Sequence, residues 1–302
     1  MLLGIPYLEV AETVAVLCLC GVVAGFLAGL LGIGGGIIFV PCFTFVFTVF
    51  FNTPLDIAIL IATGTSLLCM IPTSISAARS QHKKGNTDLE VIKSWSVAML
   101  LGVVVGIMTS KFFGGAWLSI LFGSLMILNA LNTLFRAKAK PAFSKLPGPF
   151  GQRCIAFLIA CFSSMLGIGG GTLTVPVLNA CSVPPHKSIG TSSAVSLFVC
   201  VPGALLMIFT NLSNTPHAAP LGTFGLVNVL TAICVIPISY ICAPLGVNIG
   251  KSIAPVTLKR VFAVALFIIS VNMLYKGITH YTGMDGEQTR VSSVAFNTFS
   301  KV

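Results

Sequence analysis

The sequence predicts an all-α polytopic membrane protein, an inverted-topology repeat of two five-segment halves with glycine-broken helices near the bilayer midplane. Three observations predict this fold class. The 302 residues are 56% hydrophobic and only 8% charged, whereas roughly 25% of the residues of an ordinary soluble domain are charged. A glycine-rich motif occurs twice, and the basic loops are distributed oppositely in the two halves.

The composition excludes several classes of protein. Too few charged residues are present to cover the surface of a cytosolic enzyme, and the apolar content excludes a disordered chain or a secreted disulfide scaffold. The formal net charge is +10, from 17 basic and 7 acidic residues. In a soluble protein this surplus would suggest nucleic-acid binding, but here the basic residues lie in loops between apolar segments. We therefore predict no nucleic-acid partner.

The apolar segments of the first half are long enough to cross a bilayer, which takes about 20 residues. No Lys or Arg precedes Arg79, so the positive region that opens a cleavable signal peptide is missing and the first segment is predicted to be retained. The first repeat (1–137) is predicted to contain segments at 13–31, 35–51, 57–79, 89–110 and 116–136.

A basic cytoplasmic linker (138–153) is predicted to join the first half to a second repeat (154–277), and a polar tail (278–302) to follow. The segments at 154–167 and 170–182 are each short for a full crossing, so glycine-interrupted pairs are read as tilted spans, broken helices or re-entrant hairpins. The predicted segments of the second repeat are 154–167, 170–182, 188–210, 223–249 and 257–276.

The halves share motifs in the same order. Residues 30–41 read LLGIGGGIIFVP and residues 165–176 read MLGIGGGTLTVP. The segment Gly64-Thr65-Ser66 recurs as Gly190-Thr191-Ser192, and Asp88 has a counterpart in Asn228 at a constant offset. Such ordered repetition indicates an internal duplication.

The charged loops predict that the second half is inverted. Cytoplasmic loops of membrane proteins carry an excess of Lys and Arg, which places 79–93 and 136–153 inside and both termini outside. The counterpart of 79–93 is 211–222, which has no basic residue, whereas 250–260 has three. This assignment puts 13 of the 17 basic residues in the cytoplasm. Inverted repeats are typical of secondary transporters.

The triple glycines Gly34-Gly35-Gly36 and Gly169-Gly170-Gly171 are predicted to line the substrate path. Glycine destabilises a helix by about 1 kcal/mol per residue relative to alanine, and unwound backbone at membrane depth is tolerated only inside protein or beside a wet cavity. A helix that restarts after such a break presents free N–H groups and the positive end of its dipole. The alternative is a purely structural kink. Nucleotide binding is disfavoured because the flanks are membrane-length segments and no Lys follows.

Hydroxyl side chains near these motifs form a second group of predicted substrate contacts, because a hydroxyl can donate a hydrogen bond to an anion. The alternative is that they bond to their own helix or pack between neighbours. Pro41 and Pro176 follow the triplets at equal distance and are predicted to hold the irregular geometry. The predicted hydroxyl contacts are Thr65, Ser66, Thr172, Thr191, Ser192 and Ser193.

The positions of the acidic residues favour an anion as substrate. All seven lie in the termini or near segment ends, whereas cation and proton transporters place carboxylates within the membrane. The pair His186-Lys187 precedes the second Gly-Thr-Ser segment. It is read either as an attraction for anions at the cytoplasmic mouth or as an ordinary loop charge.

No cofactor, metal site or catalytic residue is predicted. The ten cysteines are scattered through apolar segments without zinc-type spacing, and we interpret them as small packing residues. The Gly-x-Ser-x-Gly motif of hydrolases is missing. The sequence therefore predicts that the protein is not an enzyme.

At these residues the chain resembles the sulfite exporter TauE/SafE family, the TSUP permeases. Members carry two copies of a motif like Leu-Gly-Ile-Gly-Gly-Gly-x-x-x-x-Pro, each followed by Gly-Thr-Ser and a later Gly-x-x-Asp/Asn. The resemblance covers about residues 13–277. It implies a multi-pass plasma-membrane transporter of sulfur-containing anions such as sulfite or sulfonates, although some members handle other organic acids. The stretch between triple glycine and Gly-Thr-Ser differs by nine residues between the halves.

Together these features predict a secondary transporter or facilitator that moves small anions across the plasma (bacterial inner) membrane by alternating access. Sulfite, sulfonate, thiosulfate or related organic acids are the candidate substrates. The predicted partners are this anion and the lipid bilayer, and protons stay open as a coupling ion. An anion channel, whose flux does not saturate, is the first alternative. An intramembrane enzyme, which turns over a substrate without vectorial movement, is the second.

Overall fold

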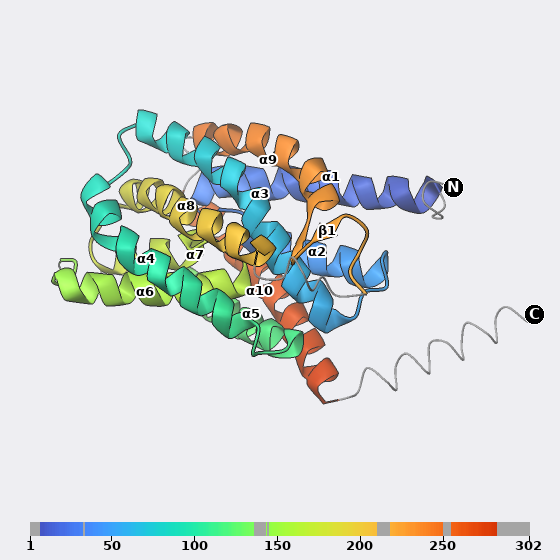
Figure 1. The fold of residues 1–302 in the computed structure, drawn as a ribbon. Helices are drawn as coiled ribbons and strands as arrows, with labels where there is room; N and C mark the ends of the chain where they lie inside the picture. The colour runs from blue at the N-terminus through green and yellow to red at the C-terminus, as the bar shows by residue number, and fades with distance from the viewer. Residues whose placement is uncertain are drawn as a thin grey trace, which may run out of the picture.

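The computed structural model describes residues 7–32, 34–135, 143, 145–209, 218–249 and 255–282. In these ranges the chain forms ten helices and one short hairpin (Figure 1). The helices are α1 (Tyr7–Leu31), α2 (Gly36–Val49), α3 (Leu55–Lys83), α4 (Leu89–Ser110), α5 (Gly115–Phe135), α6 (Pro149–Leu166), α7 (Gly171–Ala180), α8 (Pro185–Phe209), α9 (Val229–Ile249) and α10 (Pro255–Tyr281). The hairpin pairs β1 (Thr223–Phe224) with β2 (Val227–Asn228).

Each predicted segment corresponds to one helix, with differences at the boundaries. The segment predicted from residue 223 begins as a helix only at Val229, because residues 223–228 form the antiparallel hairpin, whose turn contains Gly225 with a φ of 61°. Helix α6 begins at Pro149 rather than 154, with proline at its first position, where no backbone N–H is needed. The last five residues of the predicted linker 138–153 therefore belong to α6, and its residues 138–142 and 144 lie outside the described residues.

The described helices identify a multi-pass membrane protein. Seven of them are long and apolar enough to span a bilayer. Large apolar side chains are exposed along their outer faces, including Val97 and Leu101 on α4 and Ile233 and Ile241 on α9. At 14 and 10 residues, α2 and α7 are about 21 and 15 Å long, too short to cross the hydrocarbon core of about 30 Å.

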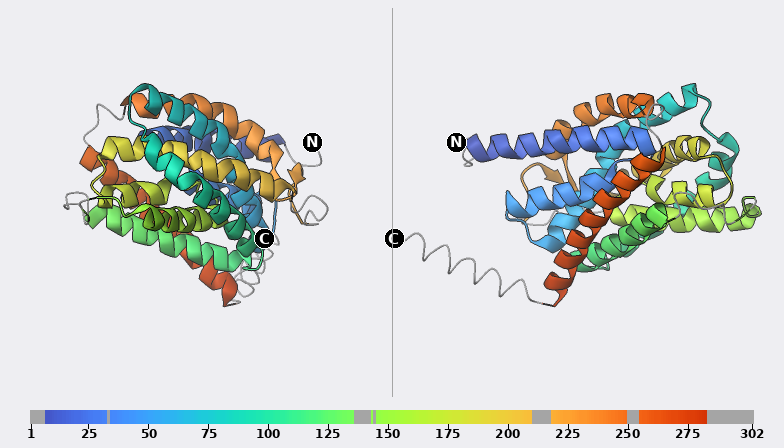
Figure 2. Two further views of the ribbon diagram at one scale, coloured as in Figure 1. Left: turned by 60° about the vertical axis from the view of Figure 1, so that its left-hand side comes forward. Right: turned by 180° about the vertical axis from the view of Figure 1, so that it is seen from behind.

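The outer helices pack in pairs whose contacts depend on glycine. Helix α1 packs on α9, and α4 packs on α6. A Cβ atom on Gly25 of α1 would collide with the backbone of Ser239, and one on Gly29 with the backbone of Ala243. A Cβ atom on Gly102 of α4 would likewise collide with the backbone of α6. These positions show the close helix approach that small residues spaced four apart allow. Figure 2 shows both pairs flanking the centre of the bundle.

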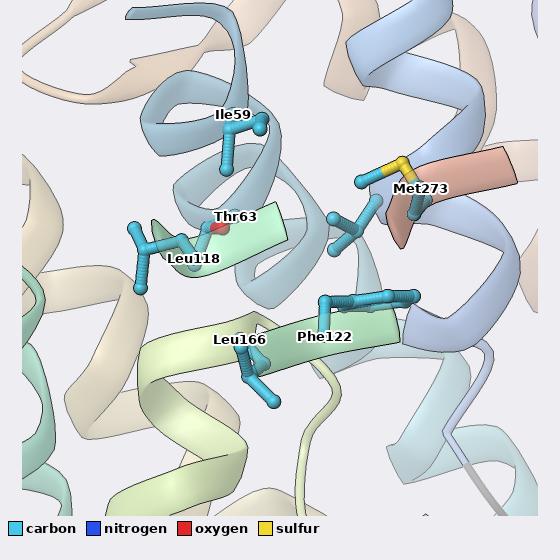
Figure 3. Close-up of a pocket in the computed structure, with 7 residues that line it drawn as sticks. Ile59, Thr63, Leu118, Phe122, Leu166 and Met273 are labelled. Atoms are coloured by element: carbon cyan, nitrogen blue, oxygen red, sulfur yellow. The ribbon is translucent and has the colours of Figure 1, made fainter. Parts of the chain in front are cut away.

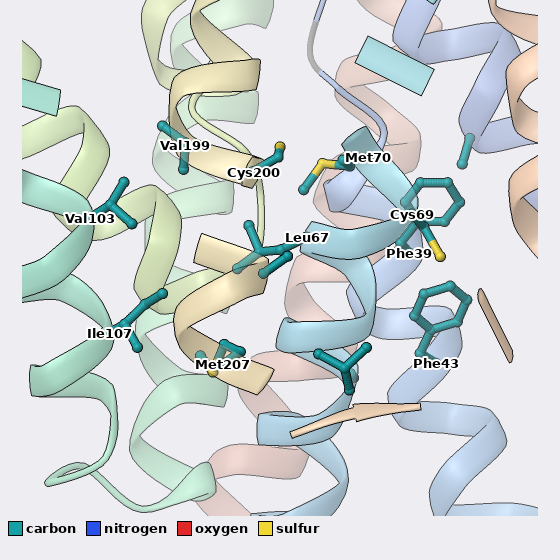
Figure 4. Close-up of a cluster of buried hydrophobic side chains, with 14 of the residues drawn as sticks. Phe39, Phe43, Leu67, Cys69, Met70, Val103, Ile107, Val199, Cys200 and Met207 are labelled. Carbon is teal, nitrogen blue, oxygen red and sulfur yellow. The ribbon is translucent and has the colours of Figure 1, made fainter. Parts of the chain in front are cut away.

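Helices α3 and α8 pack together in the centre. The main cluster of buried side chains joins α2, α3, α4 and α8, and includes Phe39, Phe43, Leu67, Val103 and Met207 (Figure 4). No Asp, Glu, Lys or Arg is buried among the residues whose burial is described. The carboxylate-free interior predicted from the sequence is thus observed over these residues.

Candidate functional site

Two glycine loops whose glycines share positive φ angles interrupt the chain. The first joins α1 to α2 and includes Gly32, Gly34 and Gly35; the second joins α6 to α7 and consists of residues 167–170. In each loop the first, third and fourth positions have φ between 68° and 84°. Residues with a Cβ atom rarely adopt this conformation, so the glycines are required by the backbone. The predicted helix breaks are confirmed in both halves.

The loops of the two halves touch each other. Gly36, the first residue of α2, packs on the second loop: a Cβ atom there would lie 2.5 Å from the carbonyl oxygen of Gly167 and 2.7 Å from Ile168 Cα. Only a residue without a side chain fits. Gly36 and Gly167, which are 131 positions apart in the sequence, therefore meet at one buried place, and all members of the two predicted triplets are buried.

Helix α7 begins with backbone donors that have no acceptor among the described residues. Leu173 and Thr174 donate to the carbonyl of Gly170, as Ile38 and Phe39 donate to that of Gly35. Neither helix has a side-chain N-cap. Within the described ranges, we find no acceptor for the N–H groups that open α7 at Gly171 and the next residue. The first N–H groups of a helix need a partner, and a buried helix start without one is unusual.

Thr172 adds a side-chain donor at the same place. The residue is 2% exposed, and its hydroxyl has no hydrogen-bond partner among the described residues. Its carbonyl oxygen accepts a hydrogen bond of 3.1 Å from Asn129 on α5, which fixes the first turn of α7. Of the predicted hydroxyl contacts, Thr172 is the one whose hydroxyl neither donates nor accepts a hydrogen bond among the described residues.

The hydroxyls of the first Gly-Thr-Ser segment are engaged with the protein. Thr65 Oγ1 donates to the carbonyl of Ile61 (2.6 Å) and accepts from the backbone N–H of Asn228 (2.8 Å). Ser66 Oγ donates to the carbonyl of Gly167 (2.8 Å). A Cβ atom on Gly64 would collide with the carbonyl of Leu226. The segment therefore joins α3 to the second glycine loop and to the hairpin before α9.

The second Gly-Thr-Ser segment has matching contacts. Thr191 Oγ1 accepts from the backbone N–H of Asp88 (2.9 Å), and Ser192 Oγ donates to the carbonyl of Gly32 (2.8 Å). Ser193 Oγ donates to the carbonyl of Ile189 in its own helix (3.0 Å). These contacts fit the structural alternative considered above, and hydrogen bonding of these hydroxyls to an anion stays a prediction.

The remaining predicted residues lie in α2, α7 and α8. Pro41 and Pro176 lie within α2 and α7, and both are partly buried. His186 and Lys187 are exposed in the first turn of α8, six and five residues before Ser192. A narrow apolar crevice borders the second loop, between α3, α5 and α6, and is lined by Thr63, Leu118, Phe122 and Leu166 among others (Figure 3). It has no room for a water molecule.

Sequence reasoning missed two sets of residues. Asp88 caps α4 by accepting from Glu90 and Val91 N–H groups, and Asn228 caps α9 by accepting from Thr231. The constant offset between Asp88 and Asn228 was the sequence signal that could have identified these caps.

Met70 was also missed, although Met70 Sδ would lie within 3.3 Å of a Cβ atom on Gly34, Gly36 or Gly169. An apolar residue in an apolar helix has no distinguishing pattern.

Comparison with known proteins agrees with these features. The profile of the family described as "Sulfite exporter TauE/SafE" matches residues 17–273. A "Probable membrane transporter protein" of Haemophilus influenzae is 29% identical over 268 residues, covering 87% of this chain and 99% of its own. YunE of Bacillus subtilis, with the same description, is 28% identical over 87% of this chain and 98% of its own. No solved structure matches the chain.

Proposed function

Because the chain belongs to the sulfite exporter TauE/SafE family, we propose that it is a secondary transporter or facilitator of small anions in the plasma membrane. Sulfur-containing anions, including sulfite, sulfonates and thiosulfate, are the first candidates, followed by related organic acids. Membrane transport is what the names of its relatives have in common. We propose no catalytic step.

The observation that carries the proposal is the buried start of α7. Backbone N–H groups and the hydroxyl of Thr172, all without a partner among the described residues, converge there with the positive end of the helix dipole. Each of these favours a negative charge. A cation would find no buried carboxylate among the described residues. The anion is proposed to bind between the two glycine loops, with the Gly-Thr-Ser segments as the walls of the site.

The packing supports an inverted repeat. The pairing of α1 with α9 has its counterpart in that of α6 with α4, and α3–α8 and α5–α10 each pair a helix with its own counterpart. The bond between Thr65 and Asn228 corresponds to that between Thr191 and Asp88. Equivalent contacts with the halves exchanged are what a pseudo-two-fold axis in the membrane plane generates.

The same packing suggests which bodies move. Helix α9 of the second half packs on α1 and α3, and α4 of the first half packs on α6 and α8. A rocking motion of one sequence half against the other would break these glycine-mediated contacts. We propose instead that α1–α3 with α9 form one body and α6–α8 with α4 form the other, and that α3 and α8 meet at the interface where access alternates.

Flux into proteoliposomes tests the proposal. Purified protein should take up radiolabelled sulfite, thiosulfate or a sulfonate with saturation and with counterflow, which distinguishes a transporter from a channel. Repeating the assay under an imposed pH gradient tests protons as the coupling ion. Absence of flux for every small anion tried, with folded protein in the vesicles, would contradict the proposed function.

A further inference from the structure

Met70 lies at the point where the two glycine loops approach each other. A Cβ atom on Gly34 would lie 3.3 Å from Met70 Sδ, and one on Gly36 or Gly169 would lie 2.9 Å from it. Met70 itself is 0% exposed. One thioether on α3 thus contacts both loops and the start of α2, and fills the space between the two halves.

A buried hydroxyl and a buried thiol lie near this apolar side chain. Ser74, one turn further along α3, is 1% exposed and its hydroxyl lacks a hydrogen-bond partner within the described structure. That hydroxyl lies beside the thiol of Cys200 on α8, and a Cβ atom on Gly169 would lie 3.0 Å from Cys200 Sγ. A buried hydroxyl without an acceptor is unfavourable, and this is expected beside a path that is closed in this conformation.

The helices are weakened where these side chains originate. Pro72 follows Met70 by two residues in α3, and Pro202 follows Cys200 by two residues in α8. A proline inside a helix removes one backbone hydrogen bond and favours bending at that point. Methionine is also unbranched and adapts its shape readily. Figure 4 shows Met70 reaching toward Cys200, while Cys69 points away from both.

We propose that Met70 is the gate of the anion path: its side chain occupies the gap between the glycine loops in this closed conformation and withdraws to admit the anion. This inference rests on the proposed function, because it assigns a gate to the same site. Withdrawal exposes the Ser74 hydroxyl, the Cys200 thiol and the glycine loops to one water-filled space. Met70 then controls access to the donors and does not itself hold the anion.

Thiol labelling tests the gate without requiring a known substrate. In a variant whose only cysteine is Cys200, the anionic reagent methanethiosulfonate ethylsulfonate is applied from each side of the membrane in turn. With Met70 present, the reaction is expected to be slow. With Met70→Ala it should be at least about tenfold faster from at least one side, because a thiol reacts only when solvent reaches it. Met70→Leu, which keeps the volume, should leave the rate within about twofold of the original.

A second background, with Cys69 as the only cysteine, separates an opened gate from a loosened fold. Cys69 is also 0% exposed and adjoins Met70 in sequence. Met70→Ala should leave its labelling slow. The proposed gate would be contradicted if Met70→Ala left the labelling rate of Cys200 unchanged. It would also be contradicted if Met70→Leu accelerated Cys200 labelling as much as Met70→Ala does, or if Met70→Ala accelerated the labelling of Cys69 as much as that of Cys200. Labelling that behaves as expected in a protein without anion flux would instead locate the failure in the proposed function.

Discussion

Ser192 on α8 donates a hydrogen bond of 2.8 Å to the carbonyl oxygen of Gly32, 160 positions earlier in the chain. Ser66 on α3 makes the corresponding bond to the carbonyl of Gly167, also at 2.8 Å. Each half thus supplies the donor that holds the glycine loop of the other half. The loops need such support because a run of glycines has little conformational preference of its own.

Replacing Ser66 with alanine is expected to destabilise the protein by about 1–3 kcal/mol, because the buried carbonyl of Gly167 loses its side-chain donor. The midpoint of unfolding in detergent measures the effect. Ser124→Ala is the control: Ser124 is exposed on α5 and donates only within its own helix, so its change should stay below about 0.5 kcal/mol. Equal stability of the two variants would contradict the proposed support of the loop.

Alanine at Gly64 or Gly190 should prevent correct assembly. The added Cβ atom would collide with the carbonyl of Leu226 or of Asn86, respectively, and backbone cannot move aside without separating the helices. We expect loss of the monodisperse peak in size-exclusion chromatography. Gly148→Ala is the matched control, since nothing lies within 4 Å of a Cβ atom there. A monodisperse Gly64→Ala protein would show that this close approach is not required.

Leucine at Gly35 or Gly170 should abolish anion flux while membrane insertion is largely retained. Both glycines have φ above 79° and border buried side chains. Gly85→Leu provides the control, because Gly85 has a similar φ of 71° but no atom within 4 Å of a Cβ. Flux per inserted molecule is the measurement. Full activity of the Gly170 variant would place the path elsewhere, and loss in the Gly85 variant would point to general strain.

Asp88→Ala should cost about 0.5–2 kcal/mol of stability, the usual effect of removing an N-cap. Asp88→Asn should restore most of this loss, because Asn228 performs the equivalent capping of α9. Unfolding midpoints of the two variants, measured together with the original protein, give the comparison. If asparagine proves as damaging as alanine, Asp88 has a role that depends on its negative charge.

The predicted orientation is open to cysteine labelling. In a cysteine-free background, Lys145→Cys should react with a membrane-impermeant maleimide only after permeabilisation, since the positive-inside rule places this linker in the cytoplasm. Gly114→Cys, in the exposed turn between α4 and α5, should react in intact cells. The reverse pattern would invert the topology.

The helices and their breaks could be predicted from the sequence because long apolar runs and triple glycines are local signals. The start of α6 at Pro149 was missed because Gly151, Gln152 and Arg153 look like linker. Residues 223–228 were assigned to a helix because their apolar content cannot distinguish a short hairpin from a helical turn.

The contacts of the candidate site could be predicted only in part. The glycine triplets were identified by their repetition, yet the partners of Thr65 and Thr191 are backbone N–H groups in distant segments. Spacing along one sequence does not contain that information. Whether a hydroxyl is engaged or free, as at Thr172, depends on tertiary packing, and so does the position of Met70 between the loops.

The packing of α9 on α1 and α3 also sets the order in which the protein can be completed during synthesis. The glycine face of α1 has no permanent partner until residues 229–249 leave the ribosome. Until then that face must be covered by lipid or by the insertion machinery. The first 137 residues made alone should therefore be a substrate for membrane proteases, and co-expression with the second half should rescue them.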